Sequence, residues 1–112
     1  MTSDATTKDR VGLAERERVL MLLRAKEAEF RALGVTRLRL FGSMARGEAG
    51  PESDVDLIAE IDHGFGFSLL DLVGLQQDLG ELIGRKVEIA TAAERMRPRI
   101  RRRVEADAIE VF

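Results

Sequence analysis

The chain has 112 residues, of which 45% are apolar and 34% are charged, and its formal net charge is −2. This length suits one domain with a modest core, so an arrangement of two domains is excluded. The sequence contains no cysteine, so disulfides and thiolate metal sites are excluded. It shows no apolar run long enough to span a bilayer and no secretory signal, so we expect a cytoplasmic protein.

The first part of the chain predicts a tail, a helix and a strand. Residues 1–12 are polar and predict a disordered tail, which leaves residues 13–112 as a single domain. Residues 14–33 carry apolar side chains at helical spacing, and Gly34 follows at the place where a helix commonly ends. Residues 36–41 alternate between apolar and other side chains, which predicts a strand with one buried face.

The later part of the chain predicts the remaining strands and helices. Residues 54–61 alternate again and predict a second strand. Ser68 is suited to cap a helix with Asp71 as its capping-box partner, and helical spacing then continues up to Gly84. We expect next a third strand, an arginine-rich helix that begins or bends near Pro98, and a short last strand, at residues 85–91, 94–107 and 109–112.

These elements predict an α+β (α/β) fold in which a small mixed β-sheet has helices packed on one face. Alternation along the strands turns six apolar side chains toward those helices: Leu38, Leu40, Val55, Leu57, Val87 and Ile89. The opposite face of the sheet then presents Asp54, Asp56 and Glu88. The strand pattern alone therefore predicts three carboxylates on one open face.

Asp54 and Asp56 form an Asp-x-Asp pair on the second predicted strand. Residues two apart on a strand lie on the same side, roughly 7 Å apart along the chain. Carboxylates this close repel each other unless a cation lies between them, and Mg²⁺ is usually bound by one or two carboxylates together with substrate phosphates. Taken alone, such a pair is more often a solvated strand face than a metal site.

The turn before this strand favours the metal site. Gly42 allows the backbone to come close to a ligand, and Ser43 offers a hydroxyl and can begin a short helix whose free N–H groups attract phosphate. Arg46 adds a positive charge that suits phosphate oxygens. A glycine turn with a helix cap would explain these residues by themselves. Followed by an Asp-x-Asp strand, they predict a site for a metal-bound triphosphate.

Two segments resemble the signature of the DNA polymerase β-type nucleotidyltransferase superfamily: Gly-Ser-Met-Ala-Arg-Gly at residues 42–47 and Ser-Asp-Val-Asp-Leu at residues 53–57. The short length and the order of the later elements resemble its minimal nucleotidyltransferase branch, and the likeness covers residues 14–112. The resemblance implies the nucleotidyltransferase fold and the transfer of a nucleoside monophosphate from an NTP to a hydroxyl.

The resemblance also implies roles for six residues. Gly42 and Ser43 would bind the β- and γ-phosphates of the nucleotide, with help from Arg46. Three carboxylates would bind two Mg²⁺ ions and carry the catalysis: Asp54, Asp56 and Glu88. Glu88 departs from the family pattern, which usually has aspartate there. It would bind the second ion or accept the proton of the acceptor hydroxyl.

The size of the chain limits its function, because it leaves no room for a second domain that binds the acceptor. In the minimal branch the resemblance implies a hetero-oligomer with a HEPN-domain protein. That partner is a ribonuclease toxin, and the nucleotidyltransferase is the antitoxin. It silences the toxin by transferring AMP from ATP to a tyrosine hydroxyl.

Two other functions remain open from the sequence. The chain can instead be a non-catalytic antitoxin that neutralises its partner by binding it, and the departure at Glu88 favours this hypothesis. The intact Gly42, Ser43, Asp54 and Asp56 favour the enzyme. A third hypothesis is a small-molecule nucleotidyltransferase whose active site is completed by dimerisation.

An arginine cluster lies near the C-terminus and consists of Arg95, Arg97, Arg99, Arg101, Arg102 and Arg103. It fits either a docking face for an acidic partner or an RNA contact. Neighbouring acidic residues dilute its charge, and no aromatic side chain lies among the arginines to stack on bases. A solvated helix face explains the cluster equally well, and direct binding of nucleic acid is not expected.

Overall fold

The computed structural model describes residues 4–62, 64, 66, 68–91 and 97–112. The elements in chain order are α1 (Asp4–Arg24), α2 (Glu27–Ala32), β1 (Val35–Phe41), α3 (Gly42–Ala45), β2 (Val55–Ile61), α4 (Leu69–Ile83), β3 (Val87–Ala90), α5 (Pro98–Asp107) and β4 (Ile109–Glu110). The four strands form one sheet in the order β3-β2-β1-β4. β1 is antiparallel to β2 and β4, whereas β2 and β3 are parallel, so the predicted mixed sheet is confirmed.

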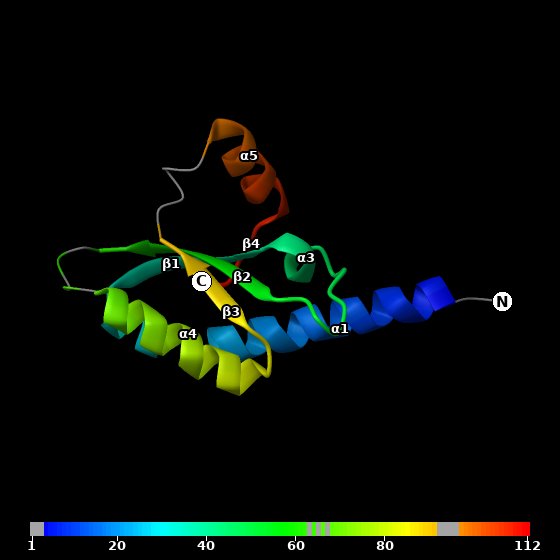
Figure 1. The fold of residues 1–112 in the computed structure, drawn as a ribbon, viewed down its shortest axis with the longest axis horizontal. Helices are drawn as coiled ribbons and strands as arrows, with labels where there is room; N and C mark the ends of the chain where they lie inside the picture. The colour runs from blue at the N-terminus through cyan, green and yellow to red at the C-terminus, as the bar shows by residue number, and fades with distance from the viewer. Residues whose placement is uncertain (1–3, 63, 65, 67, 92–96) are drawn as a thin grey trace.

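The core lies between the sheet and the helices α1, α2 and α4, which cover one of its faces (Figure 1). The six strand residues that alternation turned toward the helices are all buried there, as predicted. The helices contribute the facing side chains Val19, Leu20, Leu23, Phe30, Leu79 and Ile83. Burial of the six apolar strand residues fixes which face of the sheet packs on the helices. The residues that alternate with them along the strands therefore face away from this core.

The N-terminal part of the chain differs from the expectation in two ways. α1 begins at Asp4, within the segment that we expected to be a tail. Gly12 is buried against the turn that follows α3, and a Cβ there would overlap the Gly47 carbonyl. The single helix expected over residues 14–33 is broken by a turn between α1 and α2. This turn redirects the chain and brings the ring of Phe30 to 5.6 Å from that of Phe112.

The boundaries of α4 follow the local sequence, as predicted. Asp71 N–H donates to the Ser68 hydroxyl, and Ser68 N–H donates to the Asp71 carboxylate, which completes a capping box. The helix ends at Gly84, whose φ of 81° is left-handed. α4 is thereby held at a defined length beneath the sheet. None of the described helices is long and apolar enough to cross a membrane.

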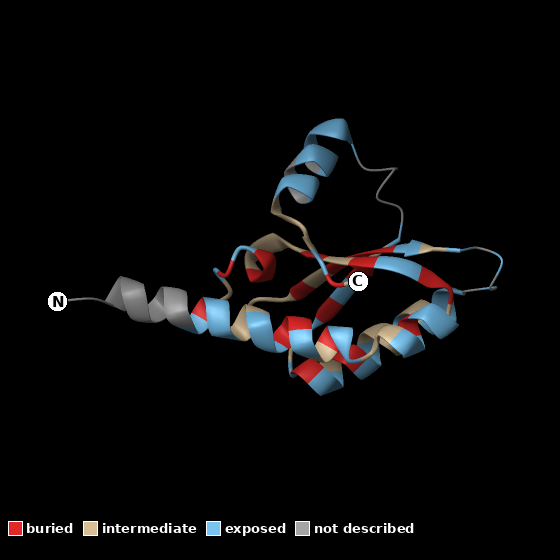
Figure 2. Ribbon diagram, turned by 180° about the vertical axis from the view of Figure 1, so that it is seen from behind, coloured by how far each residue is buried: buried red, intermediate tan, exposed pale blue. Residues whose placement is uncertain are grey.

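The arginine-rich helix α5 begins at Pro98, as the sequence indicated. It stands on the other side of the sheet from α1 and α4, beside α3 (Figure 1), and Figure 2 shows it largely exposed. Its last residue, Asp107, accepts a hydrogen bond from Arg46 Nη1 at 3.1 Å. Residues 92–96, and with them Arg95, lie outside the described residues, as does the side chain of Arg103.

Three charged side chains connect α1, the end of α4 and the segment before β2. Arg18 Nε donates to Glu15 Oε1 at 2.7 Å, and Arg85 Nε donates to Glu15 Oε2 at 2.7 Å. Arg18 also donates to the carbonyl of Ile83 at 2.8 Å. The Arg18 guanidinium, and then that of Arg85, lower the pKa of Glu15 to about 2, although partial burial acts in the opposite direction.

We expect the Glu15→Gln substitution to lower the free energy of unfolding by about 1 kcal/mol at pH 7. This value is small for hydrogen bonds between charged groups because Arg18 is partly exposed to solvent. The native pKa of about 2 lies below the ordinary value of 4.5, so the stabilisation is present above pH 4.5 and is lost as the pH falls toward 2. Urea titrations at several pH values check this. The difference between variant and wild type should shrink between pH 5 and pH 3, and a constant difference would contradict the assignment.

Candidate active site

The register of the sheet brings three segments of the sequence together. Asp56 on β2 lies opposite Phe41 on β1 and opposite Glu88 on β3. Gly42 follows Phe41 directly and begins α3. The turn after β1 and the carboxylates of Asp56 and Glu88 therefore lie on adjacent strands, so the structure brings Gly42, Asp56 and Glu88 to one end of the sheet.

Gly42 lies directly against the carboxylate of Asp56. Its φ is 77°, a left-handed conformation that side chains rarely adopt, and a Cβ built there would lie 2.9 Å from Asp56 Oδ2. A side chain at this position would therefore fill the space beside the carboxylate. The bare backbone of Gly42 leaves that space open for a ligand that contacts both groups.

Ser43 follows Gly42 in the first turn of the four-residue helix α3. N–H groups in the first turn of a helix have no partner within the helix, so they are suited to accept an anion. The carbonyl of Ser43 accepts a hydrogen bond from Glu48 N–H at 2.9 Å, which turns the chain back toward β2. Ser43 is partly exposed, so its hydroxyl and backbone are accessible to a phosphate.

The carboxylates influence one another electrostatically. Partial burial raises the pKa of Asp56, and the charges of Glu88 and then Asp54 raise it further. Three negative groups are therefore close enough to oppose the ionisation of the central one. A bound cation would relieve this repulsion, as expected for a site that binds divalent metal.

Glu88 is held by a neighbour that the sequence analysis did not consider. Lys86 Nζ lies 3.1 Å from Glu88 Oε1, and the negative charges of Glu88 and Asp54 raise the pKa of Lys86. Both partners are more than half exposed, so this ion pair contributes little to stability and is readily broken. The ammonium group of Lys86 lies where it partly neutralises the carboxylates.

Arg46 lies at the end of α3, where its guanidinium is held by two carboxylates. Its Nε donates to Glu48 Oε2 at 3.1 Å, and its Nη1 donates to Asp107 Oδ2 at 3.1 Å. The hydrogen bonds that Arg46 donates to Glu48, and then to Asp107, raise the pKa of Arg46. Arg46 therefore connects α3 to the end of α5 in this structure, and its assistance in phosphate binding stays a prediction.

A comparison with protein families assigns this fold to a known family. The family model described as a nucleotidyltransferase domain matches residues 23–111, which include the turn at Gly42 and all three carboxylates. The chain belongs to the nucleotidyltransferase domain family. It is a nucleotidyltransferase with a mixed sheet and the minimal set of elements, so both the predicted fold and the predicted class of enzyme are confirmed.

Relatives of this nucleotidyltransferase agree with that assignment. A protein of Methanocaldococcus jannaschii, provisionally named a protein adenylyltransferase, is 40% identical over 79 residues, which are 70% of this chain and 82% of the relative. A solved structure provisionally described as a minimal nucleotidyltransferase has a TM-score of 0.62 and 38% identity, over 86% of this chain and 88% of that one. A toxin–antitoxin structure with AMP-PNP shares the fold, with a TM-score of 0.62 at 17% identity over 80% of this chain and 72% of that one.

The donor groups of this nucleotidyltransferase fit a divalent ion only in part. Asp56 offers oxygen ligands next to the open space at Gly42. Asp54 is close enough for its charge to act on Asp56, and nucleotide phosphates would complete the shell of an ion there. Among the described side chains, no group of three carboxylates or histidines gathers closely enough to surround one ion. Glu88 would have to turn away from Lys86 to join the two aspartates.

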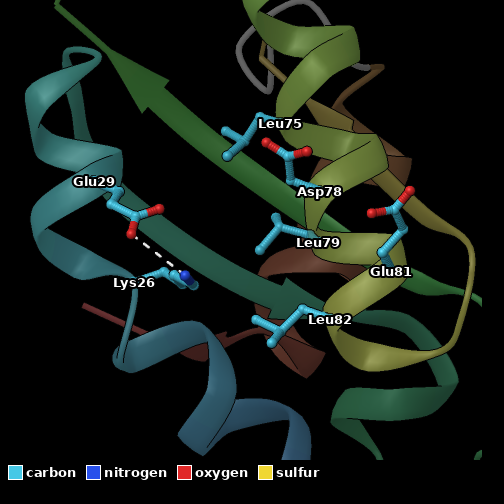
Figure 3. Close-up of a pocket in the computed structure, with 7 residues that line it drawn as sticks. All are labelled: Lys26, Glu29, Leu75, Asp78, Leu79, Glu81 and Leu82. Atoms are coloured by element: carbon cyan, nitrogen blue, oxygen red, sulfur yellow. Dashed lines mark hydrogen bonds and ion pairs between the residues drawn. The ribbon is translucent and has the colours of Figure 1, made fainter.

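A cavity of about 420 Å³ borders the candidate site of the nucleotidyltransferase. Its lining includes Phe41, Asp56, Gln76, Lys86 and Glu88. Gln76 closes one side, since its side-chain oxygen accepts a hydrogen bond from the backbone N–H of Ile89 at 2.8 Å. A second cavity of similar size, shown in Figure 3, lies between Lys26, Glu29 and α4 on the helix-covered side, away from the carboxylates.

Proposed function

We propose that this nucleotidyltransferase transfers AMP from ATP to a tyrosine hydroxyl of a HEPN-domain toxin, and thereby acts as the antitoxin of a toxin–antitoxin pair. The observation that carries the proposal is the closeness of Gly42 to the Asp56 carboxylate, because a phosphate bound at the turn would then lie beside a metal ion bound by Asp56. The name of the Methanocaldococcus relative supports adenylyl transfer to a protein. The toxin–antitoxin structure with AMP-PNP supports a toxin partner.

In the proposed reaction, the acceptor oxygen attacks the α-phosphorus of ATP. A new O–P bond forms as the bond to pyrophosphate breaks, and the proton of the hydroxyl leaves to a carboxylate or to water. Gly42 and Ser43 bind the leaving phosphates through their backbone and hydroxyl groups. Asp54 and Asp56 would hold Mg²⁺, and the ion would supply positive charge to neutralise the phosphate oxygens.

The acceptor reaches this site from the partner. The described residues form one sheet with its covering helices, and we propose that no part of them binds the acceptor in the manner of a separate domain. Asp56 and Glu88 alternate along β2 and β3 with side chains buried beneath the sheet, so they lie on the opposite face and a tyrosine of the partner approaches from that side. The two proteins therefore form a hetero-oligomer during the reaction.

A second candidate function is neutralisation by binding alone. The observation that favours it is the ion pair of Glu88 with Lys86, together with the finding that no group of three metal ligands gathers among the described residues. A site in which Glu88 never joined the aspartates would bind nucleotide and partner but turn over slowly. The antitoxin would then act by covering the toxin.

Transfer of label distinguishes the two functions. The protein is incubated with the product of the adjacent gene, Mg²⁺ and ATP labelled at the α-phosphate, and the Asp54→Ala/Asp56→Ala variant serves as the control. We expect label on the partner with the wild-type protein and none with the variant. Tight binding of the partner by both proteins, with no label in either reaction, would reject the enzyme and support the binding antitoxin.

We expect the Glu88→Ala variant to transfer label at least about tenfold more slowly, since general acid–base catalysis contributes roughly 100-fold or more. The Glu88→Asp variant restores the residue that the family usually has and should retain most of the rate. Initial rates at saturating ATP check this. Lys86→Ala removes only the competing ion pair and should not slow transfer. A Glu88→Ala variant with the full rate would show that Glu88 has no role.

A further inference from the structure

A network around Arg85 lies outside the candidate site and holds the segment that leads into it. Arg85 follows α4, and its side chain is only 14% exposed. Its Nη1 donates two hydrogen bonds, to the carbonyl of Gly50 at 2.9 Å and to the carbonyl of Ser53 at 2.7 Å. Its Nε donates to Glu15 at 2.7 Å. One guanidinium therefore connects α1, the start of β3 and the turn immediately before Asp54.

The turn that Arg85 contacts has few other bonds to the rest of the molecule. Within it, Ser53 N–H donates to the Gly50 carbonyl at 3.2 Å, and Gly50 N–H donates to the Ser53 hydroxyl at 2.8 Å. Val55 N–H then donates to the carbonyl of Lys86, the residue after Arg85, at 2.8 Å. Asp54 thus lies between two residues that are hydrogen-bonded to the segment just before β3: Ser53 is bonded to Arg85, and Val55 is bonded to Lys86.

Glu88 lies on the strand that begins directly after this attachment. Val87 pairs with Val55 and Glu88 pairs with Asp56, so β3 and β2 are in fixed register from that point on. The Arg85 side chain extends the connection backward from the paired strands to the turn before Asp54. It therefore determines where the first aspartate stands relative to Asp56 and Glu88.

We propose that Arg85 is a positioning residue for divalent metal: it holds the backbone on which Asp54 meets the ion together with Asp56. The inference rests on the proposed function, because it takes Asp54 as a metal ligand. Arg85 does not touch the nucleotide or the ion. It acts through the Gly50 and Ser53 carbonyls, and Glu15 in turn orients its guanidinium. Groups that orient metal ligands in this way typically change metal affinity by about 10- to 100-fold when they are removed.

Arg18 offers a matched control for this proposal. It is also an arginine bound to Glu15, with bonds of 2.7 and 2.9 Å, but its other partner is the carbonyl of Ile83 at the end of α4. Arg18→Ala therefore removes a guanidinium from the same carboxylate without touching the turn before Asp54. A loss of metal affinity that comes only from general destabilisation should appear in both the Arg18→Ala and the Arg85→Ala variants.

The test is a titration of the full-length protein with Mn²⁺, followed by electron paramagnetic resonance, in the presence of AMP-PNP. We expect Arg85→Ala to weaken Mn²⁺ binding about tenfold and Arg85→Lys to weaken it less, because lysine keeps donors but cannot reach all three acceptors. Arg18→Ala should bind Mn²⁺ as the wild type does, even where its melting temperature falls. If Arg85→Ala does not fold, the Mn²⁺ affinity of Arg85→Lys tests the proposal, and it should still be lower than that of the wild type.

The two proposals fail in different ways. Wild-type protein that binds no Mn²⁺ with AMP-PNP would overturn the proposed function itself. Wild-type protein that binds Mn²⁺, with equal affinity in the Arg85 variants, would overturn the positioning role and leave the function intact. Equal weakening in the Arg18 and Arg85 variants would also overturn it, since the effect would then follow stability and not the turn before Asp54.

Discussion

We expect the Asp56→Asn variant to lose adenylyl transfer by more than about a hundredfold, which corresponds to about 3 kcal/mol of transition-state stabilisation. Asparagine keeps the shape of aspartate but lacks the charge that binds a divalent ion. Asp56 is the central carboxylate, paired across the sheet with both Phe41 and Glu88. The measurement is the initial rate of label transfer from ATP to the partner at saturating Mg²⁺. A rate within a factor of a few of the wild type would reject Asp56 as a metal ligand.

The same variant should be more stable than the wild type when no divalent ion is present. Burial and the neighbouring charges raise the pKa of Asp56 above its ordinary value in the folded protein. Ionisation of Asp56 therefore destabilises the fold as the pH rises through its pKa. We expect a higher melting temperature for metal-free Asp56→Asn at pH 7, and no difference below the ordinary pKa of aspartate. A lower melting temperature at pH 7 would contradict the assigned crowding of charges.

We expect Gly42→Ala to abolish stabilisation by ATP and Mg²⁺, and to slow transfer by about a hundredfold or more, as loss of an aligned phosphate-binding group does. The new Cβ would lie 2.9 Å from Asp56 Oδ2, so either the turn or the carboxylate must move. The left-handed φ of 77° adds a backbone cost of roughly 1–2 kcal/mol for any other residue. The shift in melting temperature on adding nucleotide and Mg²⁺ measures the effect.

Gly50→Ala is the matched control for the Gly42 variant. Gly50 lies in the same connection between α3 and β2, but a Cβ there meets no heavy atom within 4 Å. Its carbonyl, which accepts from Arg85, remains in the alanine variant. We therefore expect this variant to keep its response to nucleotide. A similar loss in both variants would mean that the connection as a whole, and not the contact of Gly42 with Asp56, binds the phosphates.

Local patterns were enough to predict most of the fold. Alternation in the strands identified the buried face, because a strand cannot turn Leu38 and Leu40 inward without turning Arg39 outward. The capping box at Ser68 and the left-handed Gly84 delimited α4 because both devices act within one helical turn. Gly42, Asp56 and Glu88 lie close together because the three predicted strands that carry or precede them pair in one sheet.

Contacts between residues far apart in the sequence could not be predicted in this way. The sequence does not reveal that α5 returns to Arg46 and that Asp107 accepts a hydrogen bond from it. Arg85 carried no signal, because its partners are a glutamate 70 positions earlier and two backbone carbonyls. Lys86 could have been noticed, since residues two apart on a strand share a face and a lysine there faces the same way as Glu88.

Incubation of the partner toxin with ATP labelled at either the α- or the γ-phosphate tests the proposed reaction most directly. Transfer of AMP leaves the α-label on the toxin and releases the γ-label with pyrophosphate, and a peptide map should locate the label on a tyrosine. We expect α-label on the toxin in the presence of Mg²⁺, none with Asp54→Ala/Asp56→Ala, and no γ-label in either case. A toxin that gains γ-label, or that is silenced without gaining any label, would contradict adenylyl transfer.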